Sequence, residues 1–180
     1  MYDASTPAAA FLGDRRLAAG PLAEVARAVA ACAEPGRALI LLADGRPIDL
    51  DLRGTPDEVA ARLPASSGGE PRGRGRPKLG VTAREVTLLP RHWDWLARQP
   101  GGASVALRKL VEAAQKDPRE EARVAREAAY RAMTVLAGDR PNYEEATRAL
   151  FAGDGEALGR LIADWPVDIR DHLLTLARLS

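Results

Sequence analysis

The chain has 180 residues, of which 46% are hydrophobic and 28% are charged, and its formal net charge is +1. This composition can bury enough apolar surface to offset the chain entropy lost on folding, which excludes an intrinsically disordered chain. Cys32 is the only cysteine, which excludes a disulfide within the chain and a zinc cluster built on cysteines. The N-terminus lacks a secretory pattern, and every apolar run is far shorter than the ~20 residues that cross a bilayer, so we expect a cytoplasmic protein that is not bound to a membrane.

The N-terminal segment predicts a strand, a helix and a hairpin. Ala10–Gly13 is a short extended segment, and Pro21–Ala33 has apolar residues at helical spacing. A continuous apolar run at Leu39–Leu42 is followed by the turn dipeptide Asp44-Gly45. Residues 48–53 then alternate apolar and charged side chains, which predicts a second strand with one buried face and one solvated face.

A second helix closes this domain and a linker follows it. Thr55 is a good N-cap, with Pro56 at the first helical position and Glu58 at the third, so the helix should cover Pro56–Leu63. Residues 1–63 are therefore predicted to form a small α+β domain. Residues 64–82 are rich in Pro, Ser, Gly and Arg and read as a basic flexible linker.

The linker contains a motif that resembles an AT-hook, whose core is Arg-Gly-Arg-Pro. Glycine lets a backbone approach the floor of a narrow minor groove, while the arginines extend along it into its negative potential. The alternative is an arginine-rich linker with no ligand. The predicted minor-groove residues are Arg72, Arg74, Gly75, Arg76, Pro77 and Lys78.

Residues 83–115 resemble a ribbon-helix-helix unit, in which a short strand pairs with the same strand of a second chain and enters the major groove. The strand would be Glu85–Leu89, the first helix Arg91–Arg98 and the second helix Val105–Gln115, capped by Ser104. The ordinary alternative is a strand followed by a helical hairpin. Predicted contacts to the DNA major groove or backbone are Arg84, Thr87, Arg91 and Ser104. Predicted dimer-interface residues are Val86, Leu88, Leu89 and Trp93.

Two registers of this strand remain open. If Leu89 faces the core, the period of two places Leu88 and Val86 outward, which departs from the polar, base-reading side chains of ribbon-helix-helix proteins. A shift by one residue instead exposes Thr87 and Glu85. In the helix that follows, we expect Trp93 to be a core anchor with Leu96 and Ala97, and Trp95 to lie near the surface.

Residues 116–180 are predicted to be a helical region. A long helix should open at Asp117-Pro118 and end at Gly138. Three shorter helices fit Tyr143–Phe151, Glu156–Ala163 and Val167–Leu179. The expected inner face of the long helix consists of Val124, Ala128, Ala132, Val135 and Leu136.

The sequence offers no pattern for metal, cofactor or catalytic chemistry. His92 and His172 are the only histidines and have no partner at ligand spacing, so we expect no metal. Asp49 and Asp51 share a strand face, which reads as solvated acidic surface rather than a cation site. We find no phosphate loop, dinucleotide fingerprint or nucleophile pattern, so we expect neither a cofactor nor an enzyme.

Long runs of the chain are similar to the bacterial family called domain of unknown function 2239. These runs are Asp49–Gly54, Gly75–Val81, Arg84–Leu96 and Ala137–Pro141. The resemblance covers nearly the whole chain and implies one shared architecture, and it implies no activity.

Taken together, the sequence predicts an α+β and helical protein that binds double-stranded DNA as a homodimer, as a transcriptional regulator or nucleoid-associated factor. The terminal regions would then sense an effector, bind an unknown protein partner or stiffen the dimer. One alternative is a protein-protein adaptor whose residues 84–115 only dimerise. Another is an enzyme with an unrecognised site.

Overall fold

A computed structural model of the chain describes residues 2–65 and 84–178, which divide into two compact units. Unit 1 contains the described residues 2–65 and 122–178, and unit 2 contains the described residues 84–121. The described residues form a four-stranded antiparallel sheet and eight α-helices, which confirms the mixed α+β class. None of these helices has the length and apolar character required to span a bilayer.

The sheet lies in unit 1 and has the strand order β2-β1-β3-β4. Its strands are β1 (Pro7–Leu12), β2 (Arg15–Pro21), β3 (Ala38–Leu42) and β4 (Pro47–Ile48), and each pairs antiparallel with its neighbours. The predicted extended segment at Ala10–Gly13 overlaps β1, but β1 starts earlier, at Pro7, and forms a hairpin with β2, a strand that the sequence did not predict. The sequence of β2 contains arginines and a glycine and shows no alternation of apolar and polar residues, so the strand was not predicted. Such a sequence is common for a partly exposed edge strand.

Both faces of the sheet are covered, which explains why its two central strands read as continuous apolar runs. Side chains alternate between two clusters along each strand. Ala8, Ala10, Ile40 and Leu42 belong to one cluster, and Ala9, Phe11 and Leu41 belong to the other.

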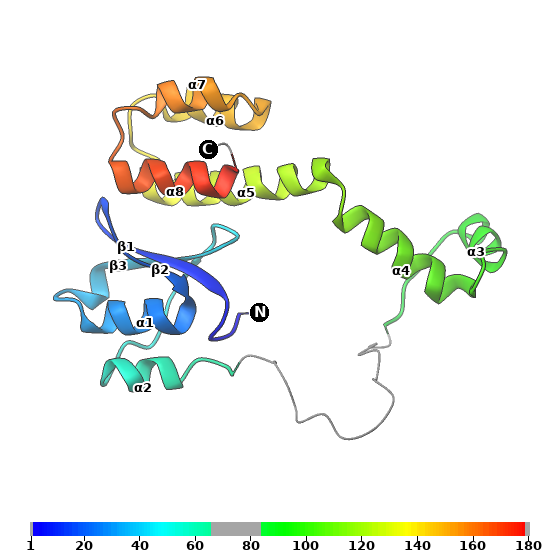
Figure 1. Cartoon of the computed structure of the whole chain (residues 1–180), viewed down its shortest axis with the longest axis horizontal. Coiled ribbons are helices and arrows are strands. Elements are labelled where there is room, and N and C mark those ends of the chain that lie inside the picture. The colour runs from blue at the N-terminus through cyan, green and yellow to red at the C-terminus, as the bar shows by residue number, and fades with distance from the viewer. Residues whose placement is uncertain (1, 66–83, 179–180) are drawn as a thin grey trace. The chain divides into compact units, whose positions relative to one another are not determined.

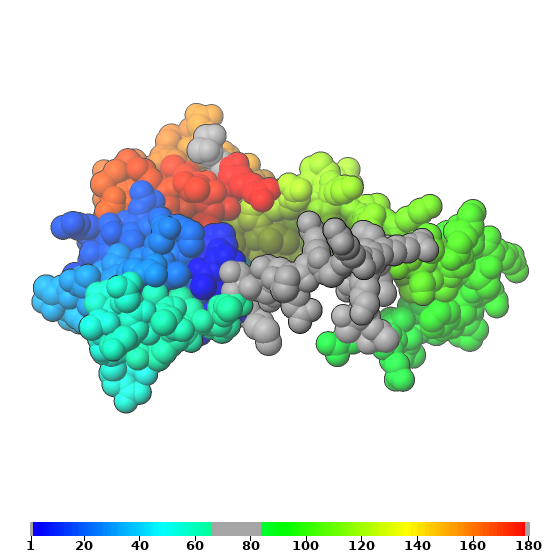
Figure 2. Space-filling model, turned by 60° about the horizontal axis from the view of Figure 1, so that its bottom comes forward, coloured from blue at the N-terminus to red at the C-terminus, as the bar shows by residue number. Residues whose placement is uncertain are grey.

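One face of the sheet is covered by α1 (Leu22–Ala31), which is followed by a 3-10 turn at Pro35–Arg37 (Figure 1). Leu22, Val25 and Val29 of α1 are fully buried there. Helix α2 (Pro56–Ala61) packs beside α1, as Figure 2 shows. The predicted capping box at its start is confirmed, since the Thr55 side chain accepts from the Glu58 amide and the Glu58 carboxylate accepts from the Thr55 amide.

The other face is covered by the C-terminal helices. Helices α5 (Pro118–Ala137) and α8 (Val167–Ala177) lie next to the sheet, and α6 (Tyr143–Ala152) and α7 (Gly155–Leu161) lie on the other side of these two helices (Figure 1). Met133, Leu150, Leu158, Ile162 and Ile169 are buried with Phe11 and Leu41 in one cluster. The region that the sequence presents as a separate run of helices thus packs on the N-terminal sheet.

The predicted inner face of α5 was only partly correct. Ala128 and Ala132 are buried, but Val124 and Val135 remain 48% and 43% exposed. The packed face of α5 consists mainly of alanines and not of these valines. Their small side chains let the helix backbone approach the sheet and its turns. The buried alanines of α5 are Ala125, Ala128, Ala129, Ala132 and Ala137.

The predicted second hairpin strand is much shorter than expected. Only Pro47–Ile48 pairs with β3, and residues 49–53 form no strand. The Arg53 side chain instead donates hydrogen bonds to the Asp51 carboxylate. The Arg62 side chain donates to the backbone carbonyl of Asp51. The apolar alternation reflects contacts of Ile48, Leu50 and Leu52 with the α1 side of the sheet.

Unit 2 contains α3 (Pro90–Ala97), α4 (Gly102–Gln115) and the first turn of α5. Pro90 occupies the first turn of α3, and the left-handed Gly101 (φ 84°) precedes α4, so the Pro-Gly-Gly sequence separates the two helices. Leu96 and Ala106 are the only hydrophobic residues in the described part of unit 2 that are buried. Two buried residues form a very small core for a unit of this length.

Candidate nucleic-acid interface

The AT-hook-like segment lies outside the described residues, which stop at residue 65 and resume at residue 84. The structure therefore gives no geometry for the predicted minor-groove residues. They are Arg72, Arg74, Gly75, Arg76, Pro77 and Lys78.

The predicted strand Glu85–Leu89 is not a strand in the single chain, because residues 84–89 form no backbone ladder. A ribbon of the predicted kind takes its hydrogen-bond partners from a second copy, which one chain cannot supply. Leu88 is half-buried while Leu89 is 49% exposed. Val86, which would lie inward with Leu88 in the register that turns Thr87 and Glu85 outward, is 54% exposed, so these burials select neither register.

Leu88 lines an apolar hollow in unit 2, between residues 84–89 and the two helices α3 and α4. The hollow has a volume of about 260 Å³ and an almost entirely apolar lining. We call it the apolar hollow. It is lined by Leu88, His92, Trp95, Leu96, Leu107 and Leu110.

Helix α4 carries an apolar stripe that no described residue covers. On this helix Leu110 and Val111 are 51% and 54% exposed, and Ala114 is also exposed. Only Ala106 is buried, and Leu107 is half-buried. We call Leu107, Leu110, Val111 and Ala114 the α4 stripe. A helix with one apolar side usually buries that side against another element.

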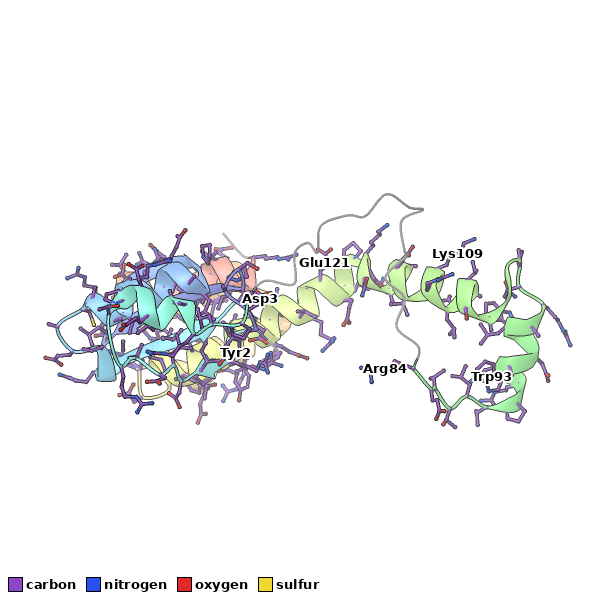
Figure 3. The ribbon with its side chains drawn as sticks, turned by 90° about the horizontal axis from the view of Figure 1, so that it is seen from below. Tyr2, Asp3, Arg84, Trp93, Lys109 and Glu121 are labelled. Carbon is purple, nitrogen blue, oxygen red and sulfur yellow. The ribbon has the colours of Figure 1, made fainter. Side chains whose placement is uncertain are left out.

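The expected core position of Trp93 in α3 was wrong, whereas the expected position of Trp95 near the surface is confirmed. Trp93, predicted as the core anchor, is 41% exposed (Figure 3), and Trp95 is 50% exposed although it lines the apolar hollow. The buried position is taken by Leu96 alone. Two neighbouring helices offer too little surface to enclose an indole.

Ser104 does not cap α4 as predicted, because Gly101 precedes the helix and Ser104 lies exposed within its first turn. Arg84 and Arg91, the other predicted backbone contacts, are exposed near Thr87 in sequence. The four predicted DNA-contact residues thus all present accessible side chains. Exposure alone does not distinguish a binding surface from an ordinary one.

The basic residues of unit 2 differ from those of unit 1 in their ion pairs. None of the basic side chains between residues 84 and 121 has a salt bridge to a described residue, although unit 2 also carries acidic side chains. These residues are Arg84, Arg91, Arg98, Arg108, Lys109, Lys116 and Arg119. Most arginines of unit 1 do pair with carboxylates, for example Arg27 with Asp57 and Arg140 with Asp14. The sequence predicted Arg84 and Arg91 of this set as DNA contacts. It did not indicate the other five, because they belong to no recognisable motif.

The described residues contain no group of three or more metal-ligand side chains. His172, taken from the sequence as an isolated histidine, is buried at 8% exposure, and its Nε2 has no hydrogen-bond partner among the residues that the structure describes. Burial, with a smaller contribution from the nearby Arg16 charge, lowers the pKa of His172 to about 4. The ring lies 5.1 Å from Phe11, centroid to centroid, so this histidine is a core residue of unit 1.

Comparison with known proteins gives a family and no further relative. Neither a curated protein nor a solved structure matches the chain. Residues 7–177 match a family described as an uncharacterized protein conserved in bacteria, domain of unknown function 2239. This match spans both units, including the residues between them, and the chain therefore belongs to that family.

Proposed function

We propose that the protein binds double-stranded DNA as a homodimer and that unit 2 supplies both the dimer interface and contacts to the phosphate backbone. The observation that carries this proposal is the set of basic side chains in unit 2 that have no acidic partner among the described residues. An unpaired arginine or lysine can contact a phosphate without first breaking an ion pair, and each such contact releases condensed counterions from DNA.

The dimer follows from the uncovered apolar surface of unit 2. With Leu96 and Ala106 as its only buried hydrophobic residues, the described part of unit 2 has too little core to hold two helices together by itself. The α4 stripe and the apolar hollow share Leu107 and Leu110, so together they form one apolar patch on unit 2. In a two-fold dimer each chain would offer this same patch to the other.

The interface would include Val86, Leu89 and Trp93, whose exposed apolar surface lies in the same unit as the stripe. Pairing of residues 85–89 with the same residues of a second chain would form the ribbon that the sequence predicts. The exposed side of that ribbon would carry Thr87, and hydroxyl groups can contact base edges or phosphates.

The basic segment before unit 2 adds a second contact to the same DNA. Its Arg-Gly-Arg-Pro sequence suits a narrow minor groove, and it directly precedes the residues that would form the ribbon. Two such segments in a dimer would favour A·T-rich duplexes by groove width rather than by base sequence.

The test is duplex binding by the full chain. Light scattering at micromolar concentration should show a dimer. Fluorescence anisotropy with A·T-rich and G·C-rich duplexes should show binding that weakens steeply with salt, with a slope of log affinity against log salt near −5 for about six neutralised phosphates. Absence of salt-sensitive binding to both duplexes would overturn the DNA proposal, and a monomer would overturn the dimer.

A protein-protein adaptor is the second candidate, and the α4 stripe favours it because an apolar helix face can also hold a partner helix. The two candidates differ in the role of the basic side chains. An adaptor would keep its dimer or partner when salt is raised and would show no affinity for duplexes.

A further inference from the structure

We propose that a hollow in unit 1 binds a small organic cation with an apolar body. The hollow has a volume of about 470 Å³, within the range of small-molecule sites. It lies between Tyr2 at the N-terminal end, the segment that follows β4 and the end of α2. We call it the Tyr2 hollow. This inference goes beyond the proposed function and does not depend on it.

The floor of the Tyr2 hollow is apolar. Val59 of α2 is 2% exposed, and Leu50 and Leu63 are half-buried beside it. The exposed surface of the hollow is mainly apolar. A hydrocarbon or aromatic group that moves from water into the hollow would therefore gain apolar contacts. The ring of Tyr2 is half-buried and adds an aromatic wall.

Two of the three charged groups that line the hollow are already satisfied within the protein. The Asp51 carboxylate accepts hydrogen bonds from Nε and Nη2 of Arg53, both at 2.8 Å, and these bonds hold the pKa of Asp51 well below its usual range. Nη2 of Arg62 donates to the backbone carbonyls of Asp51, at 2.8 Å, and Arg53. Arg62 also lies 3.9 Å from the Asp51 carboxylate.

Asp49 is the third charged group, and it has neither a hydrogen bond nor an ion pair with any described residue. The hollow thus contains one carboxylate that forms no ion pair with a described residue, beside an apolar floor and an aromatic ring. A protonated amine complements the carboxylate, and a tyrosine face also attracts a cation. The charged groups that line the hollow among the described residues are Asp49, Asp51 and Arg62, and their sum of one negative charge disfavours an anionic ligand.

The sequence alone reads Asp49 and Asp51 as equivalent, because both belong to one alternating run. The structure separates them, since residues 49–53 are not a strand and Arg53 turns back to Asp51. Among the described residues that line the hollow, Asp49 is then the carboxylate that has no hydrogen bond or ion pair.

The experiment compares three probes of one shape on the full chain by isothermal titration and amide NMR. Phenethylamine carries a positive charge, 2-phenylethanol is neutral and phenylacetate is negative. We expect phenethylamine to bind about fivefold more tightly than 2-phenylethanol, as for one partly exposed charge pair, and phenylacetate to bind least. The shifted amides should be those of Leu50, Val59 and Leu63.

Asp49→Asn is the decisive variant, and Asp57→Asn is its control. Asp57 is an exposed carboxylate on α2 that pairs with Arg27 and does not line the hollow. Asp49→Asn should bring phenethylamine to the affinity of 2-phenylethanol, while Asp57→Asn should leave the fivefold preference intact. Equal binding of the two probes to the parent, a preference that survives Asp49→Asn, or no saturable binding of any probe would each overturn the proposal. DNA binding is measured separately on the same samples, so its failure would not affect this result.

Discussion

Gly45 packs so closely on Ala128 that a Cβ atom at Gly45 would lie 2.0 Å from the Ala128 carbonyl oxygen. Gly45 is in the turn between β3 and β4, and its φ of 76° is in the left-handed region that favours glycine. Nη1 of Arg131 also donates to the Asp44 carbonyl at 3.0 Å. The hairpin turn is thus fixed directly to the backbone of α5, with no side chain between them.

Replacement of Gly45 by alanine should therefore destabilise unit 1 by about 3 kcal/mol or more, because backbone strain and a clash with helix backbone act together. Chemical denaturation measures the change. Gly13→Ala is the matched control, since Gly13 is also left-handed (φ 58°) but has nothing within 4 Å of an added Cβ. It should cost only about 1 kcal/mol. Equal losses for the two variants would contradict the contact.

Stability should decline in mild acid through His172. Its pKa is lowered to about 4 in the folded chain and returns to about 6.5 on unfolding, so the unfolded chain binds a proton that the folded chain excludes. Stability is fully present above pH 6.5 and falls as the pH drops from there to about 4, by as much as ~3 kcal/mol.

The His172→Phe variant should lose this part of the pH dependence, because an aromatic ring at that place keeps the contact with Phe11 and cannot take up a proton. Denaturation of parent and variant at pH 7, 6, 5 and 4 gives the difference directly. The carboxylates that titrate in this range are common to both proteins and cancel. Parallel curves for the two proteins would show that His172 does not govern the acid response.

An aspartate in the α4 stripe should break the proposed dimer. Leu110→Asp would place a charge where each copy is expected to bury an apolar side chain, and we expect dissociation to rise by at least tenfold. The control is Val124→Asp on α5, since Val124 is 48% exposed and Leu110 is 51% exposed. Sedimentation velocity over a range of concentrations would report both. A dimer that tolerates Leu110→Asp must use another surface.

Loss of two unpaired basic side chains should flatten the salt dependence of duplex binding. Arg108 and Lys109 are adjacent on α4 and have no salt bridge to a described residue, so Arg108→Gln with Lys109→Gln should change the slope by about two to four units across a dimer. Arg148→Gln with Arg160→Gln removes the same charge from unit 1, where both arginines pair with glutamates. That control should leave the slope unchanged.

Replacement of both Arg74 and Arg76 by alanine tests the AT-hook-like segment. We expect a salt slope flatter by about two to four units and the loss of any preference for A·T-rich over G·C-rich duplexes, because the readout of groove width is removed. The melting temperature of unit 1 serves as the control for folding. A variant that retains the A·T preference of the parent would show that this segment is only a linker.

Local signals in the sequence were sufficient for most helices and for one strand. The capping box at Thr55 and Glu58 lies where it was predicted, and the apolar run before the turn at Asp44 is β3 within one residue. These features depend on near neighbours, which a sequence displays directly. The position of Trp93 could not be read in this way, because burial of an indole depends on how much surface distant elements bring to it.

The candidate interface was predictable in its location but not in its composition. Leu110 and Val111 stand out at helical spacing, but only the structure shows that no described residue covers them. The unpaired state of Lys109 and Arg119 depends on which carboxylates lie nearby in three dimensions. Asp49 and Asp51 likewise look equivalent in the sequence. They differ in the structure because the Arg53 side chain donates hydrogen bonds to Asp51.

The two layers that cover the sheet come from opposite ends of the chain, and this order has a consequence during synthesis. Phe11 and Leu41 leave the ribosome early, but α5 and α8, which lie against their face of the sheet, are made only after unit 2. Until then one apolar sheet face stays open while all of unit 2 is translated. Contacts of such large sequence separation form slowly, so unit 1 should complete its folding only after α8 has been synthesised, and chains that end before α5 should aggregate.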